Sequence, residues 1–189
     1  MRVFCLIQGV AHQRAYVHKM GLGQICAQDF DLTDYRNTQK HNSNPRVNSS
    51  DENFVTFEQS QGGEDELCHH TLLEDCFQKI KKEKPEIDIE KDLWEPIFDT
   101  VVKTIGAFRP SVEARAEEWL GQKLPDHLDD RCWQLIGYDI AFDADFKPIF
   151  FEANAQTRQT ISMMVKQPDG SFVPGVSSFF PKVFPPLLK

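Results

Sequence analysis

Two short segments in the last third of the chain carry oxygen-rich side chains at a spacing that could support chemistry. The tripeptide GYD ends at Asp139, and the tripeptide EAN runs from Glu152 to Asn154, each inside a strand-like apolar run. If the turn between them is centred between Asp145 and Phe146, Asp139 stands opposite Glu152 in an antiparallel hairpin, and opposed residues share a face. Asn154 joins that face because side chains alternate along a strand.

Two carboxylates and an amide oxygen on one face would form a cluster of hard oxygen donors. Because neighbouring carboxylates repel each other, either one is protonated or a cation lies between them. Mg²⁺ completed by phosphate oxygens is the natural ligand of such a set. Spacing alone leaves two alternatives open: a polar, solvent-facing side of a sheet, and a glycosidase-like pair of carboxylates. The opposite face would hold the apolar residues Tyr138, Ile140, Phe142, Ile149 and Phe151.

A second group of metal-ligating residue types, Cys68-His69-His70, has a weaker chemical meaning. It lacks a second ligand pair at zinc-finger spacing, so solvated residues that precede a helix are the better interpretation.

The elements that must position the carboxylates are short strands. The alternation of apolar residues predicts strands over residues 2–10, 15–18 and 24–27, with a Gly21-Leu22-Gly23 turn, and over 132–142 and 148–154. Strands so close in sequence favour an antiparallel arrangement.

Helices are expected in the middle of the chain. Thr71 to Glu74 fits a capping box and opens a helix that Pro85 ends. A second helix starts at about Pro96 and buries Ile97, Phe98, Val101, Val102 and Ile105. A third, around 112–123, buries Val112, Ala116, Trp119 and Leu120.

Two segments have no regular pattern. Residues 28–65 form a long polar loop, which is either functional or disordered. Residues 161–189 are rich in Pro, Ser and Phe and are expected to dock on the body as a short tail. The apolar anchors of that tail are Phe179, Phe180, Val183, Phe184, Leu187 and Leu188. Residues 1–189 as a whole predict a single α/β domain, an antiparallel sheet flanked by helices.

Composition excludes several classes of protein. The 189 residues include 21 Lys and Arg against 29 Asp and Glu, a formal charge of −8, which disfavours binding to nucleic acid or an anionic membrane. No apolar run reaches about 18 residues, so no membrane-spanning helix is predicted. The five cysteines are an odd number without C-x-x-C, which disfavours a disulfide scaffold or zinc ribbon and favours reduced thiols in the cytoplasm.

The order of several motifs resembles the tubulin–tyrosine ligase-like family of ATP-grasp enzymes. The family pattern G-[FY]-D, a hairpin and E-x-N is met by Gly137-Tyr138-Asp139 and Glu152-Ala153-Asn154. Upstream, the R-x-[YFW]-x-L strand is met from Arg2 to Leu6, the Y-x-Y strand with e-G-l from Ala15 to Leu22, and the H-L-T-N-x-S-x-N loop from His41 to Asn48. Two departures are Gln24, where a basic residue is usual, and Asn42-Ser43 in place of Leu-Thr.

The resemblance implies the C-terminal part of an ATP-grasp fold and a role for each matched position. The residues implied to hold Mg²⁺ and the ATP phosphates are Asp139, Glu152 and Asn154. Those implied to contact the nucleotide from the long loop are His41, Ser43 and Asn44, and we expect this loop to lie near the carboxylates. Arg2 would reach the terminal phosphate or an acyl phosphate.

The activity implied by the resemblance is ATP-dependent ligation. A carboxylate of tubulin or another protein would be phosphorylated, and the amino group of Tyr, Glu or Gly would attack the acyl phosphate, with catalysis by positioning and electrostatics. The protein would then act in the cytoplasm, at microtubules or cilia.

Two functions stay open at this point. In the family, an upstream lobe supplies most of the adenine pocket and the phosphate-binding lysines, and this chain begins at Met1-Arg2 without it. We therefore expect residues 1–189 alone to bind ATP weakly and to show no ligase turnover. The alternative function is that of a non-catalytic fragment or pseudoenzyme that binds tubulin or another protein.

Overall fold

The computed structural model describes residues 1–55, 69–155, 162–166 and 172–176, which belong to two compact units. Unit 1 comprises Met1–Gly23 and Leu73–Thr157, and unit 2 comprises Gln24–Leu72 and Arg158–Lys189. In the part of the chain that the structure describes, no helix combines the length and the apolar character needed to cross a bilayer.

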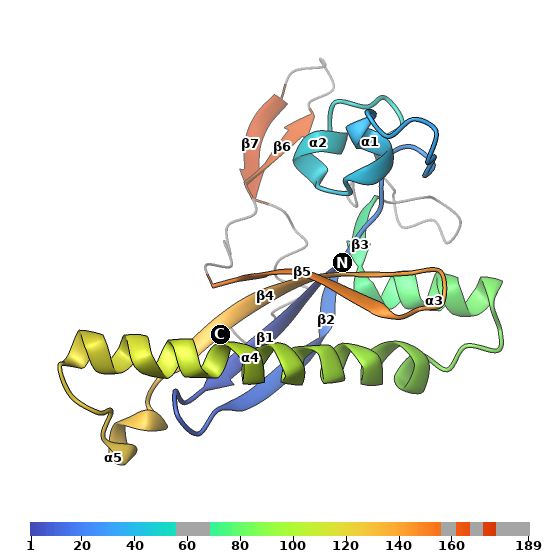
Figure 1. The fold of residues 1–189 in the computed structure, drawn as a ribbon. Helices are drawn as coiled ribbons and strands as arrows, with labels where there is room; N and C mark the ends of the chain where they lie inside the picture. The colour runs from blue at the N-terminus through green and yellow to red at the C-terminus, as the bar shows by residue number, and fades with distance from the viewer. Residues whose placement is uncertain (56–68, 156–161, 167–171, 177–189) are drawn as a thin grey trace. The chain divides into compact units, whose positions relative to one another are not determined.

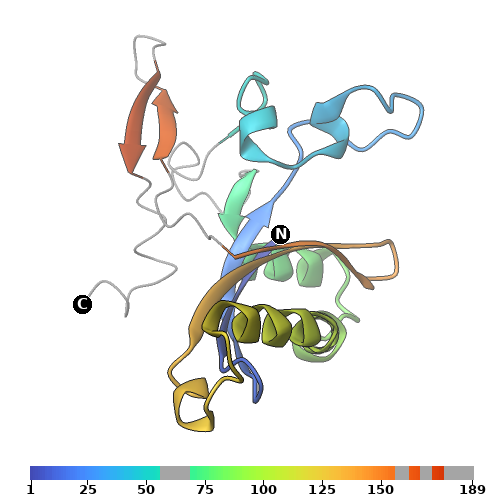
Figure 2. The ribbon, with the colours of Figure 1, turned by 60° about the vertical axis from the view of Figure 1, so that its left-hand side comes forward.

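Unit 1 is built on antiparallel strands that run in the order β2-β1-β4-β5 (Figure 1). Their bounds are Arg2–Gln8 for β1, Arg14–Gln24 for β2, Trp133–Phe142 for β4 and Pro148–Asn154 for β5. The helices are α3 (Leu73–Glu83), the π-helix η1 (Ile89–Trp94), α4 (Glu95–Leu120) and the short α5 (Asp126–Asp129). In Figure 2, α3 and α4 lie on the same side of the sheet. The predicted fold class, an α/β antiparallel sheet flanked by helices, is confirmed.

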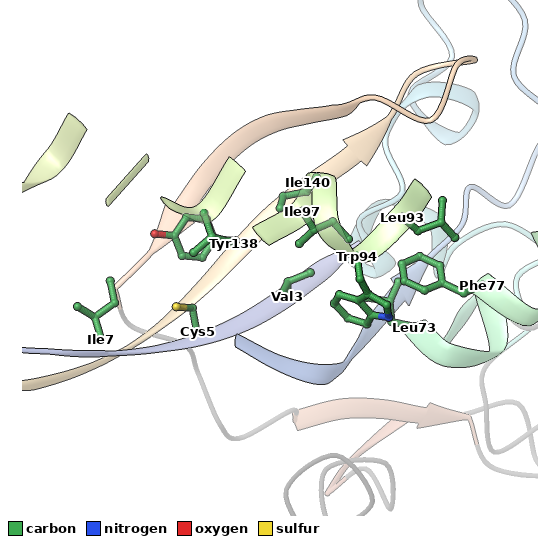
Figure 3. Packing of buried hydrophobic residues seen from close by; sticks show 11 residues of the cluster. Val3, Cys5, Ile7, Leu73, Phe77, Leu93, Trp94, Ile97, Tyr138 and Ile140 are labelled. Carbon is green, nitrogen blue, oxygen red and sulfur yellow. The ribbon is translucent and has the colours of Figure 1, made fainter. Parts of the chain in front are cut away.

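The core of unit 1 lies between that side of the sheet and the helices (Figure 3). The sheet contributes Val3, Cys5, Ile7, Tyr138 and Ile140, and the helical elements contribute Leu73, Phe77, Leu93, Trp94, Ile97 and Val101. Phe77 meets Trp94 edge to face, with ring centroids 5.2 Å apart. Burial raises the pKa of the Cys5 thiol to about 11, so this cysteine acts as a small apolar residue. The described cysteines, which leave out Cys68, form no disulfide bond.

Strand β2 corrects one prediction, because the expected pair of short strands with a glycine turn is a single strand of eleven residues. Gly21 lies inside it, opposite the start of β1. A Cβ at Gly21 would lie only 2.5 Å from the carbonyl oxygen of Arg2, and the β1–β2 register shifts between Arg2 and Phe4. The glycine therefore serves a close approach of two backbones and does not form a turn.

The β4–β5 hairpin forms as predicted, with one irregularity that changes which face some residues occupy. Asp139 pairs with Glu152, but Ile140 pairs with Phe150, so β5 carries one extra residue, Phe151, in a β-bulge. Phe150 consequently packs against the core, and Phe151 is 66% exposed. The predicted placement of Ile149 and Phe151 on the core face was wrong, because a one-residue shift exchanges the two faces of a strand.

Helix α4 replaces the two helices expected in this region, since it continues through Pro110. The proline lacks the N–H that would bond to the carbonyl of Gly106, and both residues lie on exposed turns where water can take that place. Ile97 and Val101 are buried as predicted, but Val102 and Val112 are exposed, and Trp119 is 85% exposed.

Unit 2 contains short elements inside the predicted polar loop. These are α1 (Thr38–His41) and α2 (Pro45–Asn48). Outside that loop, unit 2 contains β3 (His70–Leu72) and an antiparallel pair formed by β6 (Ser162–Lys166) and β7 (Phe172–Val176). Thr71 belongs to β3, and α3 begins at Leu73, so the predicted capping box is wrong. His69 is buried and stacks on Phe54 at 5.5 Å, which corrects its interpretation as a solvated residue. The predicted anchors of the tail, from Phe179 to Leu188, lie outside the described residues.

Candidate functional site

One arginine and two carboxylates of unit 1 lie in a row that crosses three strands. Arg2 on β1 pairs with Asp139 on β4, and Asp139 pairs with Glu152 on β5, so the three side chains lie side by side across the sheet. Tyr138 and Ile140 flank Asp139 on β4 and are almost fully buried in the core. Because successive side chains alternate, their burial forces Asp139 onto the opposite face of the sheet.

Arg2 and Asp139 form a bidentate ion pair. The Nε and Nη2 atoms of Arg2 donate to the two carboxylate oxygens of Asp139, each at 2.7 Å. The side chains are 28% and 22% exposed, so the pair is largely shielded from solvent. The hydrogen bond to Asp139 raises the pKa of Arg2, and the negative charges of Asp139 and Glu152 add to this effect. Paired, planar hydrogen bonds of this kind hold both side chains in fixed orientations.

Asn154 links the two carboxylates. Its Nδ2 donates to Oδ2 of Asp139 at 3.2 Å and to Oε1 of Glu152 at 2.9 Å. Asn154 pairs across the hairpin with Gly137, which is on the same face as Asp139. The three side chains therefore converge as the hairpin geometry predicted, while their role as metal ligands stays a prediction.

The side-chain oxygens of Asp139, Glu152 and Asn154 are hard donors of the kind that Mg²⁺ prefers. The charges of the side chains in the row determine which of these oxygens is available to the ion. The two carboxylates and the arginine sum to one negative charge, which favours a cation. Both Asp139 oxygens already accept from Arg2, whereas Glu152 is exposed and accepts only from Asn154 among the bonds that the structure describes. Glu152 is thus the carboxylate most available to a metal. Across the described ranges, no three His, Cys, Asp or Glu side chains gather at one metal site.

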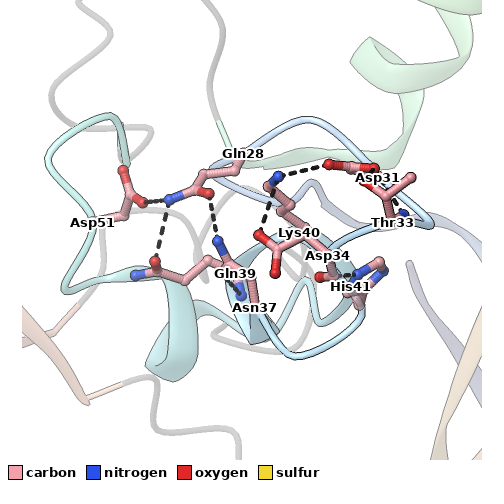
Figure 4. Close-up of polar contacts among 9 residues, drawn as sticks. All are labelled: Gln28, Asp31, Thr33, Asp34, Asn37, Gln39, Lys40, His41 and Asp51. Carbon is pink, nitrogen blue, oxygen red and sulfur yellow. Dashed lines mark hydrogen bonds and ion pairs between the residues drawn. The ribbon is translucent and has the colours of Figure 1, made fainter.

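The second set of predicted site residues lies in unit 2, and much of its polarity serves local structure (Figure 4). Nε2 of His41 lies 3.0 Å from the carbonyl oxygen of Asp34, and the ring of His41 meets that of Phe30 edge to face. Lys40 pairs with Asp31 and Asp34, and the hydrogen bond to Asp31 raises the pKa of Lys40. The lysine next to His41 is therefore already neutralised within the loop.

Asn44 has a structural task as the N-cap of α2, where its Oδ1 accepts from the backbone N–H of Arg46 at 3.0 Å. This bond leaves the Nδ2 group of Asn44 for a ligand, and the structure describes no hydrogen bond from the Ser43 hydroxyl. The loop belongs to unit 2 and the carboxylates belong to unit 1, so their predicted proximity stays a prediction.

A third carboxylate of unit 1, Asp129, is structural. It is 3% exposed and accepts hydrogen bonds from the backbone N–H groups of Val10, Ala11 and His12 at 2.6 to 3.0 Å. Burial by itself raises the pKa of Asp129, but these three donors outweigh it, and the pKa is lowered overall. Asp129 thus holds the loop between β1 and β2.

Sequence reasoning identified the carboxylate pair but missed the Arg2–Asp139 ion pair. The two residues are 137 positions apart, and only the pairing of β1 with β4 brings them together. It also missed Asn48, which is fully buried at the end of α2. The only signal for Asn48 was its place at the end of the H-x-x-N-x-x-x-N stretch.

Comparison with known proteins gives one family model and several relatives whose names all refer to the modification of tubulin. The model of the tubulin-tyrosine ligase family matches residues 1–163. The tubulin polyglutamylase ttll-11 of Caenorhabditis elegans is 24% identical over 181 residues, which are 92% of this chain and 24% of that protein. The human probable tubulin polyglutamylase TTLL2 is 26% identical over 161 residues, 85% of this chain and 24% of that protein.

A tubulin glycylase of Tetrahymena thermophila, glycylase 3F, is 25% identical over 154 residues, 82% of this chain and 15% of that protein. The chain therefore spans about a quarter or less of the length of these relatives. Because the family model covers most of the chain, including both strands of the carboxylate hairpin, this chain belongs to the tubulin-tyrosine ligase family.

Proposed function

We propose that this chain is part of an ATP-dependent ligase that joins an amino acid to a carboxylate of a protein through an acyl phosphate. The observation that carries the proposal is the row of Arg2, Asp139, Glu152 and Asn154 across one face of the sheet. A chain of this family that positions two carboxylates, an amide and an arginine side by side has the groups needed to orient a nucleotide phosphate.

In this proposal Glu152, Asp139 and Asn154 would hold Mg²⁺ through their side-chain oxygens, and Asn154 would turn its amide so that Oδ1 replaces Nδ2 beside the two carboxylates. The ion, when bound, supplies neutralisation of phosphate charge. Arg2 commits Nε and Nη2 to Asp139, and its Nη1 makes no bond among those described, so Nη1 can donate to the terminal phosphate or to the acyl phosphate. The ion pair orients the guanidinium in advance, which lowers the cost of positioning at the moment of reaction.

The loop of unit 2 contributes contacts to the nucleotide. Ser43 offers a hydroxyl that can donate and accept, and Asn44 offers Nδ2 because its Oδ1 caps α2. His41 uses Nε2 toward Asp34 and retains Nδ1 for a ligand.

The protein substrate that we propose is tubulin, at microtubules in the cytoplasm. The support is that the relatives named above are called tubulin polyglutamylases and a tubulin glycylase. Both names denote the addition of an amino acid to tubulin, so the transferred residue is Glu or Gly if this chain shares their activity, and Tyr if it shares that of the family's namesake.

A second candidate is a non-catalytic module that binds tubulin or another protein. The observation that favours it is the double engagement of Asp139 by Arg2, because an arginine that occupies both oxygens competes with a metal ion for them. In that case the ion pair is a structural link between β1 and β4.

Incorporation of labelled Tyr, Glu or Gly into tubulin tests the two candidates. We expect no turnover from residues 1–189 alone, turnover when the upstream lobe typical of the family is supplied, and a fall below about 1% of wild-type activity for Glu152→Gln. Glu90→Gln is the matched control, because Glu90 is an exposed carboxylate whose partner is Lys19. No incorporation with the upstream lobe present, together with retained co-sedimentation with microtubules, would support the second candidate.

A further inference from the structure

Asn48 is a fully buried amide whose hydrogen-bonding groups are all engaged within unit 2. Its Oδ1 accepts from the backbone N–H of Ala27 at 2.7 Å. Its Nδ2 donates to the carbonyl oxygens of Asn42 at 2.5 Å and of Asn44 at 3.1 Å. One side chain therefore joins three separate parts of the backbone.

The two carbonyls that Asn48 holds belong to the residues on either side of Ser43. The Oδ1 of Asn42 also accepts from the backbone N–H of Asn44 at 2.9 Å, which closes the same short turn. Ser43 consequently has its backbone restrained from both sides. The bond to Ala27 ties this turn to the chain that leads into the loop.

We propose that Asn48 is the positioning residue of the nucleotide loop, and that it acts by holding the 42–44 turn in the conformation that presents Ser43 and Asn44. This inference rests on the proposed nucleotide contact of those two residues. Asn48 itself is 0% exposed, so it acts through the turn and does not touch a ligand.

The chemistry of the site restricts which residue can do this. Asp keeps an acceptor for Ala27 but has no donors, and its charge would face two carbonyl oxygens. Ala would leave the buried N–H of Ala27 without its acceptor and the Asn42 carbonyl without this donor, whereas the Asn44 carbonyl would keep its bonds from the backbone N–H groups of Val47 and Asn48. The unsatisfied buried N–H carries a desolvation penalty. Ser can supply one donor and restores only part of the set.

The matched control is Asn37, an amide with a similar local task in the same unit. Its Oδ1 accepts from the backbone N–H of Gln39, and its Nδ2 donates to the side chain of Gln28. Asn37→Asp removes the amide donor to Gln28 and keeps the acceptor that caps α1. Asn48→Asp likewise removes the amide donors and keeps the acceptor for Ala27. The two variants differ in that no described bond of the Asn37 side chain reaches the 42–44 turn.

The experiment titrates Mg·ATP into the isotopically labelled 189-residue chain by NMR, which detects binding down to millimolar affinity. For Asn48→Asp we expect at least about tenfold weaker binding, because loss of two donors lowers the populated fraction of the competent turn. We expect an intermediate loss for Asn48→Ser and less than about twofold for Asn37→Asp. Amide exchange of Ser43 and Asn44 should accelerate in the Asn48 variants without nucleotide and stay unchanged in Asn37→Asp.

The outcomes separate this inference from the proposed function. If wild type binds Mg·ATP and Asn48→Asp binds it equally well, Asn48 has no positioning role and the proposed function stands. If wild type gives no shift at Ser43 or Asn44 at millimolar Mg·ATP, the proposed nucleotide contact fails and the inference fails with it. If Asn48→Asp does not fold, Asn48→Ser carries the test, and wild-type affinity with unchanged exchange at the turn would overturn the proposal.

Discussion

The Arg2–Asp139 pair allows a direct test of the candidate site, because removing Arg2 should lower the stability of the fold but should not weaken Mg²⁺ binding if Asp139 is a metal ligand. The pair is bidentate, with both bonds at 2.7 Å, and the side chains are mostly shielded from water. Hydrogen bonds to charged groups contribute about 1.5–3 kcal/mol each when one partner is removed, and removal of one partner of a buried pair costs about 3–5 kcal/mol. Residual exposure screens the charges, so we expect Asp139→Ala to lower the free energy of unfolding by about 2 kcal/mol.

The assay is a double-mutant cycle with Arg2→Ala, Asp139→Ala and the double variant. Urea unfolding can be followed through the fluorescence of buried Trp94. We expect a coupling energy of about 1.5–2 kcal/mol, because each single variant leaves a largely shielded charge without its partner. The pKa of Arg2 is raised above its ordinary, already strongly basic value by the hydrogen bond to Asp139, so the contribution of the charged guanidinium is complete at neutral pH and should not change between pH 6 and 9.

A coupling energy below about 0.5 kcal/mol would refute the reasoning, because it would place the pair among ordinary surface ion pairs. Added Mg²⁺ without nucleotide provides a second criterion, because Arg2 is also proposed to contact the phosphates of ATP. If Asp139 is a metal ligand, Arg2→Ala should leave Mg²⁺ binding intact or stronger, since both carboxylate oxygens become available. If the ion pair is only structural, Mg²⁺ should bind neither protein, and the second candidate function would gain support.

Three further predictions concern the framework of unit 1. Asp129→Asn should lower the free energy of unfolding by about 2 kcal/mol at pH 7, because a neutral amide replaces a carboxylate that accepts three backbone N–H bonds. The pKa of Asp129 is lowered from 3.8, so the stabilisation by the ionised carboxylate is complete above about pH 4–5 and is lost as the pH falls through the folded-state pKa. Urea titrations between pH 2 and 7 should show this loss of unfolding free energy in wild type and not in Asp129→Asn. Parallel pH dependences of the unfolding free energy in the two proteins would contradict the prediction. Gly21→Ala should cost about 1–3 kcal/mol in chemical denaturation, because the new Cβ would lie 2.5 Å from the Arg2 carbonyl oxygen, and a neutral result would show that β1 and β2 can separate there. Trp119→Ala should change stability by less than about 0.5 kcal/mol, since the side chain is 85% exposed, and a larger loss in thermal unfolding would mean that the indole is covered in solution.

Local patterns were enough to predict the carboxylate hairpin. Alternating residue types and a short turn fix the pairing of Asp139 with Glu152, because strands joined by a tight turn have little freedom of register. The bulge at Phe151 escaped this reasoning. A bulge depends on how Phe150 fits against Tyr138 and Phe108 in the core, and no local pattern encodes that packing.

The errors in the remaining elements have a common cause. Gly21 was interpreted through the intrinsic preference of glycine for turns, and two separate helices were expected on either side of the segment that contains Pro110. In the structure, Gly21 meets the backbone of another strand, and Pro110 lies on an exposed turn of a helix whose first half is anchored in the core. Tertiary contacts or their absence decided both cases, since propensities of about 1–3 kcal/mol are small beside the packing of a long amphipathic helix.

The sequence by itself determined the antiparallel hairpin, the convergence of Asp139, Glu152 and Asn154, and the resemblance to the family, because each depends on residues that are close in the chain or on motifs in order. Only the tertiary structure decided that Arg2 binds Asp139 and that Asn48 holds the turn around Ser43. Strand β1 can pair with any strand of suitable length, and an asparagine can cap, bridge or face solvent. The choice is made by burial, which requires every polar group taken from water to find a partner in the folded chain.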